Sequence, residues 1–190
     1  MSTAAISAGD SRDTRQRLIG VAIDLFTRHS FAGTSLQMIA DELGFTKAAI
    51  YHHFRTREQL LDTVLEPFLQ RLREIVSAAE QLRGVHARAD HLLNGFADLA
   101  VQNRVVSVLA ADPAVAGMLR GRPEWNELIE RQMTLLADVE PGPAGRVKAS
   151  FALAGIAGAS GTAFADLDRT ALRTQLIATG RRALGLRVPR

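Results

Sequence analysis

The sequence predicts an all-α protein of about nine helices, and three observations lead to this fold class. Apolar residues recur at spacings of three and four along almost all of the 190 residues, which is the period of an amphipathic helix. Alternation of β-branched or aromatic residues with polar ones, which is typical of strands, is missing. Glycine, proline and aspartate interrupt the pattern at intervals that leave segments of ordinary helical length.

Composition limits the functional classes. The chain has no cysteine, which excludes a disulfide framework, a thiolate metal site and a cysteine nucleophile. A net charge of +3 indicates a polyanionic partner only weakly. The first ten residues have neither a basic start nor an apolar run, so we expect a flexible tail rather than a signal peptide, and a cytoplasmic protein.

The first two helices follow from apolar spacing and capping residues. One apolar stripe covers residues 18–26. Thr34 and Ser35 then offer N-caps for a short helix over residues 36–43, which Gly44 stops.

A third helix and a longer fourth one come next. Thr46 caps the third helix, in which Ile50 and Phe54 form an apolar pair one turn apart. The fourth is expected over residues 57–82, with an interruption and a kink at Pro67. We therefore divide the chain into a tail, a unit of three short helical segments, a larger helical unit and a second tail. These cover residues 1–10, 11–56, 57–185 and 186–190.

The orientation of the third helix decides the function that the sequence predicts. A helix turns by about 100° per residue, so if Ile50 and Phe54 point into the core, Ala48, His52 and Arg55 lie on the opposite side and face solvent. Two short helices joined by the tight turn at Gly44 form a helix-turn-helix, whose second helix enters a DNA major groove. No acidic residue occurs between Glu42 and Glu58, so this surface is positive.

Each exposed residue of this unit then has an expected role toward DNA. Lys47, Tyr51 and His52 are candidates for contacts with base edges, and the methyl groups of Ala48 and Ala49 for contacts with thymine. Gln37 could reach either bases or phosphates. The candidates for phosphate contacts are Thr34, Ser35, Thr46, His53 and Arg57.

The stretch FTRHSFAGTSLQMIADELGFTKAAIYHHFRTREQLL, residues 26–61, closely resembles the DNA-binding domain of the tetracycline-repressor (TetR) family of bacterial transcriptional regulators. About 50 residues carry the resemblance. The matching positions are Phe26, Phe31, Gly33, Thr34, Ser35, Ile39, Ala40, Gly44, Thr46, Ile50, Tyr51, His53, Phe54, Glu58 and Leu60. The departures are Leu43 and Phe45, where alanine and valine are commoner, and Arg57, where lysine is usual.

The resemblance implies a ligand-responsive regulator that binds a double-stranded DNA operator as a homodimer. Repression would follow where the operator overlaps a promoter, and a small molecule would release the protein by binding better to the arrangement that misfits DNA. The fourth helix joins the two units and is the expected lever. We expect no cofactor, no metal and no membrane partner.

Residues 149–165 form an uncharged run of small side chains, for which three interpretations compete. The run is short and weakly apolar for a membrane span. Its glycines have the wrong spacing for a dinucleotide loop. The third interpretation is a helix that another helix approaches closely, which gives the glycines a packing reason.

The family resemblance suggests that the last two helices pair with their copies in a second subunit; a core within one chain is the alternative. The interface candidates are Phe151, Gly155, Gly158, Thr162, Leu172 and Leu176. Large soft side chains suited to an apolar effector pocket could equally be plain core. They are Phe68, Leu72, Phe96, Met118, Trp125, Leu128, Met133 and Phe151.

Two other functional classes compete with DNA binding. An enzyme is disfavoured because no histidine pair has helical metal-site spacing, no serine lies in a nucleophile elbow, and no phosphate loop follows a strand. A helical adaptor would use residues 47–55 to bind a partner protein. Salt separates the adaptor from a DNA-binding protein, because phosphate contacts weaken steeply with added salt.

Overall fold

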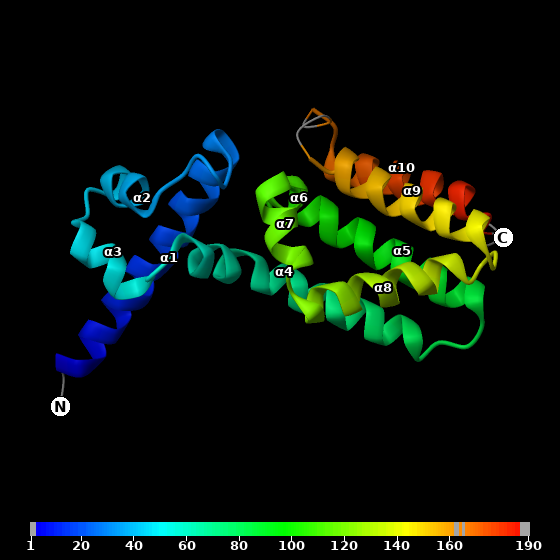
Figure 1. Ribbon diagram of the computed structural model, residues 1–190, viewed down its shortest axis with the longest axis horizontal. Coiled ribbons are helices and arrows are strands. Elements are labelled where there is room, and N and C mark those ends of the chain that lie inside the picture. Colours follow the sequence, from blue (N-terminus) through cyan, green and yellow to red (C-terminus); the bar gives the residue numbers. More distant parts are fainter. Residues whose placement is uncertain (1–2, 162–163, 165, 187–190) are drawn as a thin grey trace. The chain divides into compact units, whose positions relative to one another are not determined.

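The computed structural model describes residues 3–161, 164 and 166–186, and over these it confirms the all-α fold (Figure 1). It contains ten helices over these ranges, one more than expected. The additional boundary is at Asn103, which separates α5 (Val85–Gln102) from α6 (Arg104–Ala111). The Asn103 amide donates to the carbonyl of Leu99, and such local bonds compete with helix continuation.

The chain divides into two units, residues 1–67 and 68–190. The first contains α1 (Thr3–His29), α2 (Leu36–Leu43), α3 (Lys47–His53) and the start of α4 (Arg57–Glu80). The boundary thus lies within α4 rather than before it. The reason is that the first turns of α4 complete the core of the first unit, where Leu60 and Leu61 are buried.

The capping residues act as the sequence predicts. Ser35 and Thr46 accept hydrogen bonds from the backbone amides of Met38 and Ala49, at 3.1 and 3.3 Å. Gly44 ends α2 with φ of 67°, a left-handed conformation that glycine adopts without strain. These caps fix where α2 and α3 begin and where α2 ends.

The termini differ from expectation. Helix α1 begins at Thr3, so most of the segment expected to be a flexible tail is helical. Its alanine-containing sequence is compatible with helix extension. At the other end Leu186 is buried, and residues 187–190 of the expected second tail lie outside the described residues.

The second unit is a bundle around α5. Helices α6 and α7 (Pro113–Arg120) lead to α8 (Pro123–Ala137), α9 (Pro143–Ala159) and α10 (Arg169–Leu184). Both α8 and α10 pack on α5 and on α9. Helix α4 continues as a helix through Pro67, although the proline removes one backbone bond there.

Polar pairs and small residues join the helices of this bundle. Arg181 forms a bidentate ion pair with Asp90, and Arg173 forms one with Asp98, which link α10 to α5. Gly180 lets α10 approach α5 closely, because a Cβ at this position would lie 2.6 Å from Leu93. None of the helices in the described ranges has the length and apolar character needed to cross a bilayer.

Candidate nucleic-acid interface

Helix α3 has the orientation that the sequence predicts. Ile50 is fully buried and Phe54 is 1% exposed, so both belong to the core of the first unit. Lys47, Tyr51 and His52 are exposed, Tyr51 to 44%. The outward face of α3 therefore presents an ammonium group, a phenol and an imidazole.

Two alanines, Ala48 and Ala49, have short side chains that leave the backbone near the start of α3 close to the surface. Ala48 is exposed and Ala49 is partly exposed. The ammonium of Lys47, the first residue of α3, lies 5.7 Å from the centre of the Tyr51 ring, within cation–π range. A helix whose outward side combines small side chains with long donors can lie deep in a groove of about 12 Å width.

Helix starts supply hydroxyl groups beside this face. Ser35 and Thr46 are exposed and use their hydroxyl oxygens as acceptors in the caps. Each hydroxyl keeps its proton for donation to an anion. Gln37 is also exposed, and its amide donates to Asp41 at 2.6 Å.

The two adjacent histidines differ in environment. His52 is exposed, whereas His53 is partly buried, and their ring centres lie 5.4 Å apart. Burial, followed by the charges of His52 and Arg15, lowers the pKa of His53 below its ordinary value. The neutral imidazole of His53 is therefore favoured, and it has one donor and one acceptor.

The side chains of Thr34 and Arg57, two candidates for phosphate contacts, form hydrogen bonds within the first unit. Thr34 is 2% exposed, and its hydroxyl donates to the carbonyls of Leu25 and Ser30. The Arg57 guanidinium donates to three backbone carbonyls in the turn between α1 and α2. The buried Thr34 hydroxyl therefore stabilises the turn and is not available to a phosphate. The Arg57 guanidinium also stabilises this turn.

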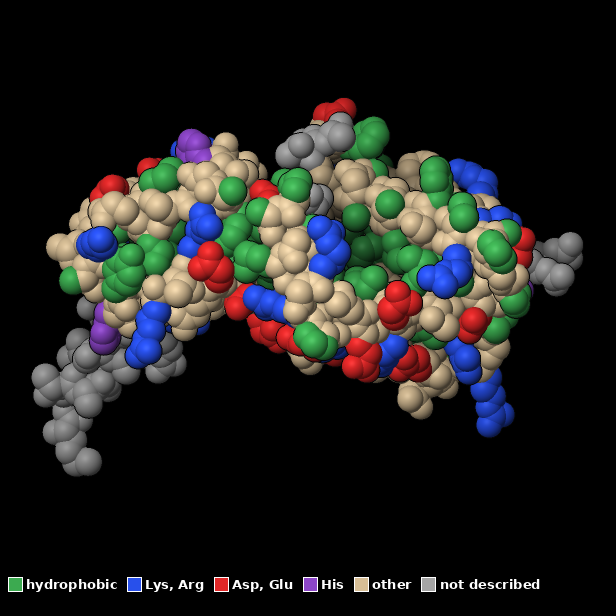
Figure 2. Space-filling view, viewed as in Figure 1, with side chains coloured by type: hydrophobic (Ala, Val, Ile, Leu, Met, Phe, Trp, Pro, Cys, Tyr) green, Lys and Arg blue, Asp and Glu red, His purple; other side chains and the backbone are tan. Residues whose placement is uncertain are grey.

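Charge on this unit is consistent with an anionic partner. From Leu43 to Arg57 the chain contains no carboxylate, and Glu42 lies 3.5 Å from Arg28 in an ion pair. Histidine and basic side chains are visible on this unit in Figure 2. The outward face of α3 lies in this acid-free window.

A comparison with known protein families identifies this unit. The model for bacterial regulatory proteins of the tetR family matches residues 18–64, which include α2, α3 and the first turns of α4. The match assigns residues 18–64, the DNA-binding unit, to the tetR family. The matched range contains the whole outward face described above.

Proteins of similar sequence include transcriptional regulators. The HTH-type transcriptional repressor KstR2 of Mycobacterium tuberculosis is 28% identical over 115 residues, which cover 56% of this chain and 58% of that protein. An uncharacterized HTH-type regulator, YerO of Bacillus subtilis, is 39% identical over 57 residues, 30% of this chain and 20% of that protein. The matched segments thus span between a fifth and three fifths of these relatives. They are named as transcriptional regulators, not as enzymes.

The fold similarity extends over both units. The solved structure of the ketosteroid transcriptional regulator KstR2 of Mycobacterium tuberculosis superposes with a TM-score of 0.69. It covers 90% of this chain and 93% of that one at 19% sequence identity. The second unit therefore has the fold of that protein although its sequence has diverged.

An open apolar groove lies between α9 and α10, which are side by side in Figure 1. Its volume is about 370 Å³, and Phe151, 69% exposed, forms part of its wall. Gly155, Leu172 and Leu176, predicted for a subunit interface, also line the groove. Sequence analysis missed Phe164 and Leu167, which are exposed apolar residues of the same wall.

The glycines of α9 have open space around them. Among the residues that the structure describes, a Cβ at Gly155 or Gly158 would meet nothing within 4 Å, so no described helix approaches these two positions closely. The close contact expected for the small-residue run is therefore not supplied from within the chain at these two positions. Thr162, the remaining interface candidate, lies outside the described residues.

The residues predicted for an effector pocket divide into two groups. Phe68, Leu72, Phe96 and Leu128 are buried. Met118, Trp125 and Met133 are partly exposed. Phe151 differs from all of them, because it lies on the open groove rather than in the interior. The role of each in ligand binding stays a prediction.

Gln132 is a polar residue inside this apolar region. It is 2% exposed on α8, one turn after Leu128, and its buried amide nitrogen has no hydrogen-bond partner in the part of the chain that the structure describes. An unpaired buried donor costs about 1–3 kcal/mol. Helical spacing places Gln132 on the buried face of α8, a signal that the sequence already contained.

Proposed function

We propose that this chain is a homodimeric transcriptional repressor that binds a duplex DNA operator and is released by a small molecule. The observation that carries the proposal is the outward face of α3, where Lys47, Tyr51 and His52 are exposed over a buried Ile50. Family membership over residues 18–64 supports the same function. A protein with this function acts in the cytoplasm.

Recognition of the operator combines two kinds of contact. Lys47 and Tyr51 supply donors to base edges, and the low surface at Ala48 and Ala49 lets the helix approach thymine methyl groups. The hydroxyls of Ser35 and Thr46 hold phosphates and fix the register of α3 in the groove. Gln37, His52 and His53 add further donors at the edge of this contact.

A second copy of the chain is the partner that best fits the groove between α9 and α10. Exposed Phe151 and Phe164 would cost the free chain solubility, whereas a matching groove on a second subunit would bury them. The open space at Gly155 and Gly158 allows the helices of a partner to approach closely. Two subunits related by twofold symmetry would bind a near-palindromic operator.

The effector would bind in the second unit, near Gln132. The unpaired amide of Gln132 would donate to an acceptor on an otherwise apolar ligand, for example a carbonyl oxygen. The neighbouring buried side chains would contact the hydrocarbon part of the ligand. KstR2, one of the relatives, is described as a ketosteroid regulator, and ketones of this kind are suitable first probes. The ligand must bind better to the form that misfits DNA.

Salt dependence distinguishes this function from that of a protein adaptor. Fluorescence anisotropy with a labelled random-sequence duplex would be measured from low to physiological salt. We expect binding whose logarithm falls linearly with the logarithm of salt concentration, because phosphate contacts release counterions. Lack of any salt-dependent duplex binding would favour the adaptor, which uses residues 47–55 against another protein.

A further inference from the structure

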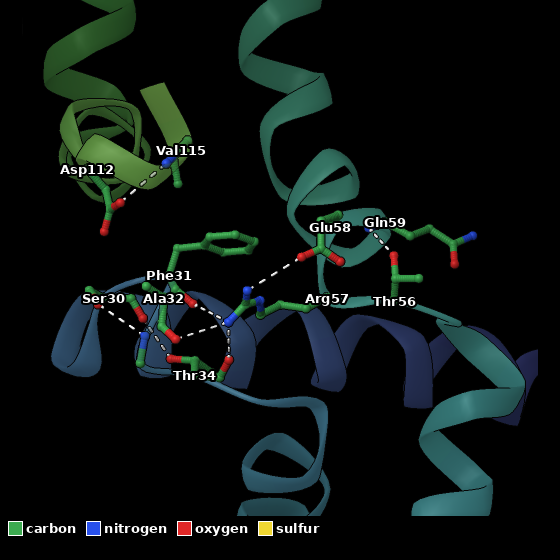
Figure 3. Close-up of polar contacts among 11 residues, drawn as sticks. Ser30, Phe31, Ala32, Thr34, Thr56, Arg57, Glu58, Gln59, Asp112 and Val115 are labelled. Atoms are coloured by element: carbon green, nitrogen blue, oxygen red, sulfur yellow. Dashed lines mark hydrogen bonds and ion pairs between the residues drawn. The ribbon is translucent and has the colours of Figure 1, made fainter. Parts of the chain in front are cut away.

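Arg57 is bonded to the turn between α1 and α2 by several contacts (Figure 3). Its Nη1 donates to the carbonyl oxygens of Phe31, Ala32 and Thr34 at 3.0, 3.1 and 2.9 Å. The guanidinium also lies over the Phe31 ring, 4.3 Å from its centre. A planar cation that both donates and stacks is more strongly restrained than a simple ion pair.

The turn provides a site shaped for a cation. Ser30 adopts a left-handed conformation at the end of α1, with φ of 63°, and Gly33 follows it. A Cβ at Gly33 would lie 2.1 Å from the carbonyl oxygen of His29, so only glycine permits this close turn. The turn directs the three carbonyl oxygens toward Arg57 at the negative end of the α1 dipole.

The backbone around Arg57, at the start of α4, is also held by hydrogen bonds. The Thr56 hydroxyl accepts from the amide of Gln59 at 3.0 Å, and the Gln59 side chain accepts from the amide of Arg55 at 2.9 Å. These two bonds hold the first turn of α4, of which Arg57 is the first residue. A cation is unfavourable at a helix N-terminus, so the carbonyl cluster offsets this cost.

The contact between Arg57 and the α1–α2 turn lies next to the start of α2, which is expected to bind DNA. Arg57 donates to the carbonyl of Thr34, whose buried hydroxyl bonds the carbonyls of Leu25 and Ser30. The next residue, Ser35, is the N-cap of α2. A displacement of Thr34 would therefore move the first turn of α2 and its exposed hydroxyl.

We propose that Arg57 is a positioning residue for operator binding, which holds the start of α2 in place through the carbonyls of the α1–α2 turn and is not itself a phosphate ligand. This inference rests on the proposed DNA-binding function. It assigns to Arg57 a role different from that expected of a cation in this positive window. Arg57→Met removes the donors but keeps much of the side-chain length, and Arg57→Lys keeps a charge with three donors.

Salt dependence separates positioning from phosphate contact. With the full-length chain and a duplex selected from a random pool, we expect Arg57→Met to weaken binding roughly tenfold, as for loss of charge-assisted hydrogen bonds. The slope of log K against log salt should stay at the wild-type value. A lost phosphate contact would instead reduce its magnitude by about 0.9. Arg57→Lys should recover most of the affinity, and Arg83→Gln, an exposed charge on the second unit, is the control.

Hydrogen exchange tests the same contact without DNA. We expect Arg57→Met to speed exchange of the amides in residues 30–38, while Arg83→Gln leaves them unchanged. A reduced salt slope with unaltered exchange, or wild-type affinity in Arg57→Met, would overturn the inference. If the wild-type chain bound no duplex, the proposed function would fail, and the exchange result would still decide whether Arg57 fixes the turn.

Discussion

Ile50 and Tyr51 are consecutive residues of α3 that point to opposite environments. Ile50 is fully buried in the core of the first unit, whereas Tyr51 is 44% exposed. One side chain therefore fixes the rotation of the helix, and the other is available to a partner. The proposed DNA contact depends on this division of α3 into an inward and an outward side.

The double substitution Lys47→Ala with Tyr51→Ala should abolish specific operator protection. Both side chains are exposed, so their removal should leave helicity and subunit mass unchanged. DNase footprinting, circular dichroism and sedimentation would measure the three properties. Normal protection by the double variant would show that base contacts lie elsewhere.

A charge in the groove between α9 and α10 should separate the subunits. A Cβ at Gly155 would meet nothing within 4 Å among the described residues, so a side chain can start there, but Gly155→Glu would bury an unpaired carboxylate between two subunits. We expect monomers by sedimentation velocity with unchanged circular dichroism. Gly117→Glu in α7, another glycine with open space around it, is the matched control and should remain dimeric. A dimeric Gly155→Glu variant would place the interface elsewhere.

Gln132→Leu should stabilise the free protein and impair its response to the effector. Leucine removes an unpaired buried amide, and we expect a gain of roughly 1 kcal/mol in the free energy of unfolding. Urea denaturation would measure this gain, and Gln102→Leu, at an exposed glutamine, should show none. The variant should still bind the operator, but ketone probes should release it less readily than the wild type. A loss of stability would mean that the amide is satisfied in solution.

Acidification should destabilise the first unit through His53. Its pKa in the folded chain is lowered, chiefly by burial, so the unfolded chain binds the proton more readily. The stabilising contribution is fully present above the ordinary histidine pKa of about 6.5 and is lost as pH falls through the folded value. Urea unfolding at several pH values should show a weaker pH dependence for His53→Gln than for the wild type. His29→Gln, at an exposed histidine, is the control, and equal profiles for His53→Gln and wild type would exclude this contribution.

The sequence contained enough information for the orientation of α3 but not for the contacts of Arg57. The short helix that begins after the Thr46 cap has one rotation that buries Ile50 and Phe54, so periodicity alone predicts its outward face. The partners of Arg57 are carbonyls more than twenty residues earlier, in a turn whose shape no side-chain pattern reveals. Long-range backbone contacts of this kind require the fold.

The last helices show a second limit of sequence patterns. Helix α9 has small apolar residues on several sides, so periodicity did not separate its core side from its exposed side. The structure places Ala152 and Ile156 inside and Phe151 outside. The close approach expected at Gly155 or Gly158 occurs instead at Gly180, against Leu93 of α5.

Selection from a random duplex pool, with the wild-type chain and the Lys47→Ala, Tyr51→Ala variant in parallel, tests most directly whether the outward side of α3 recognises a base sequence. We predict that the wild type enriches a sequence with twofold symmetry and that the variant enriches none. A wild-type pool that stays random, or the same enriched sequence from both proteins, would contradict this account.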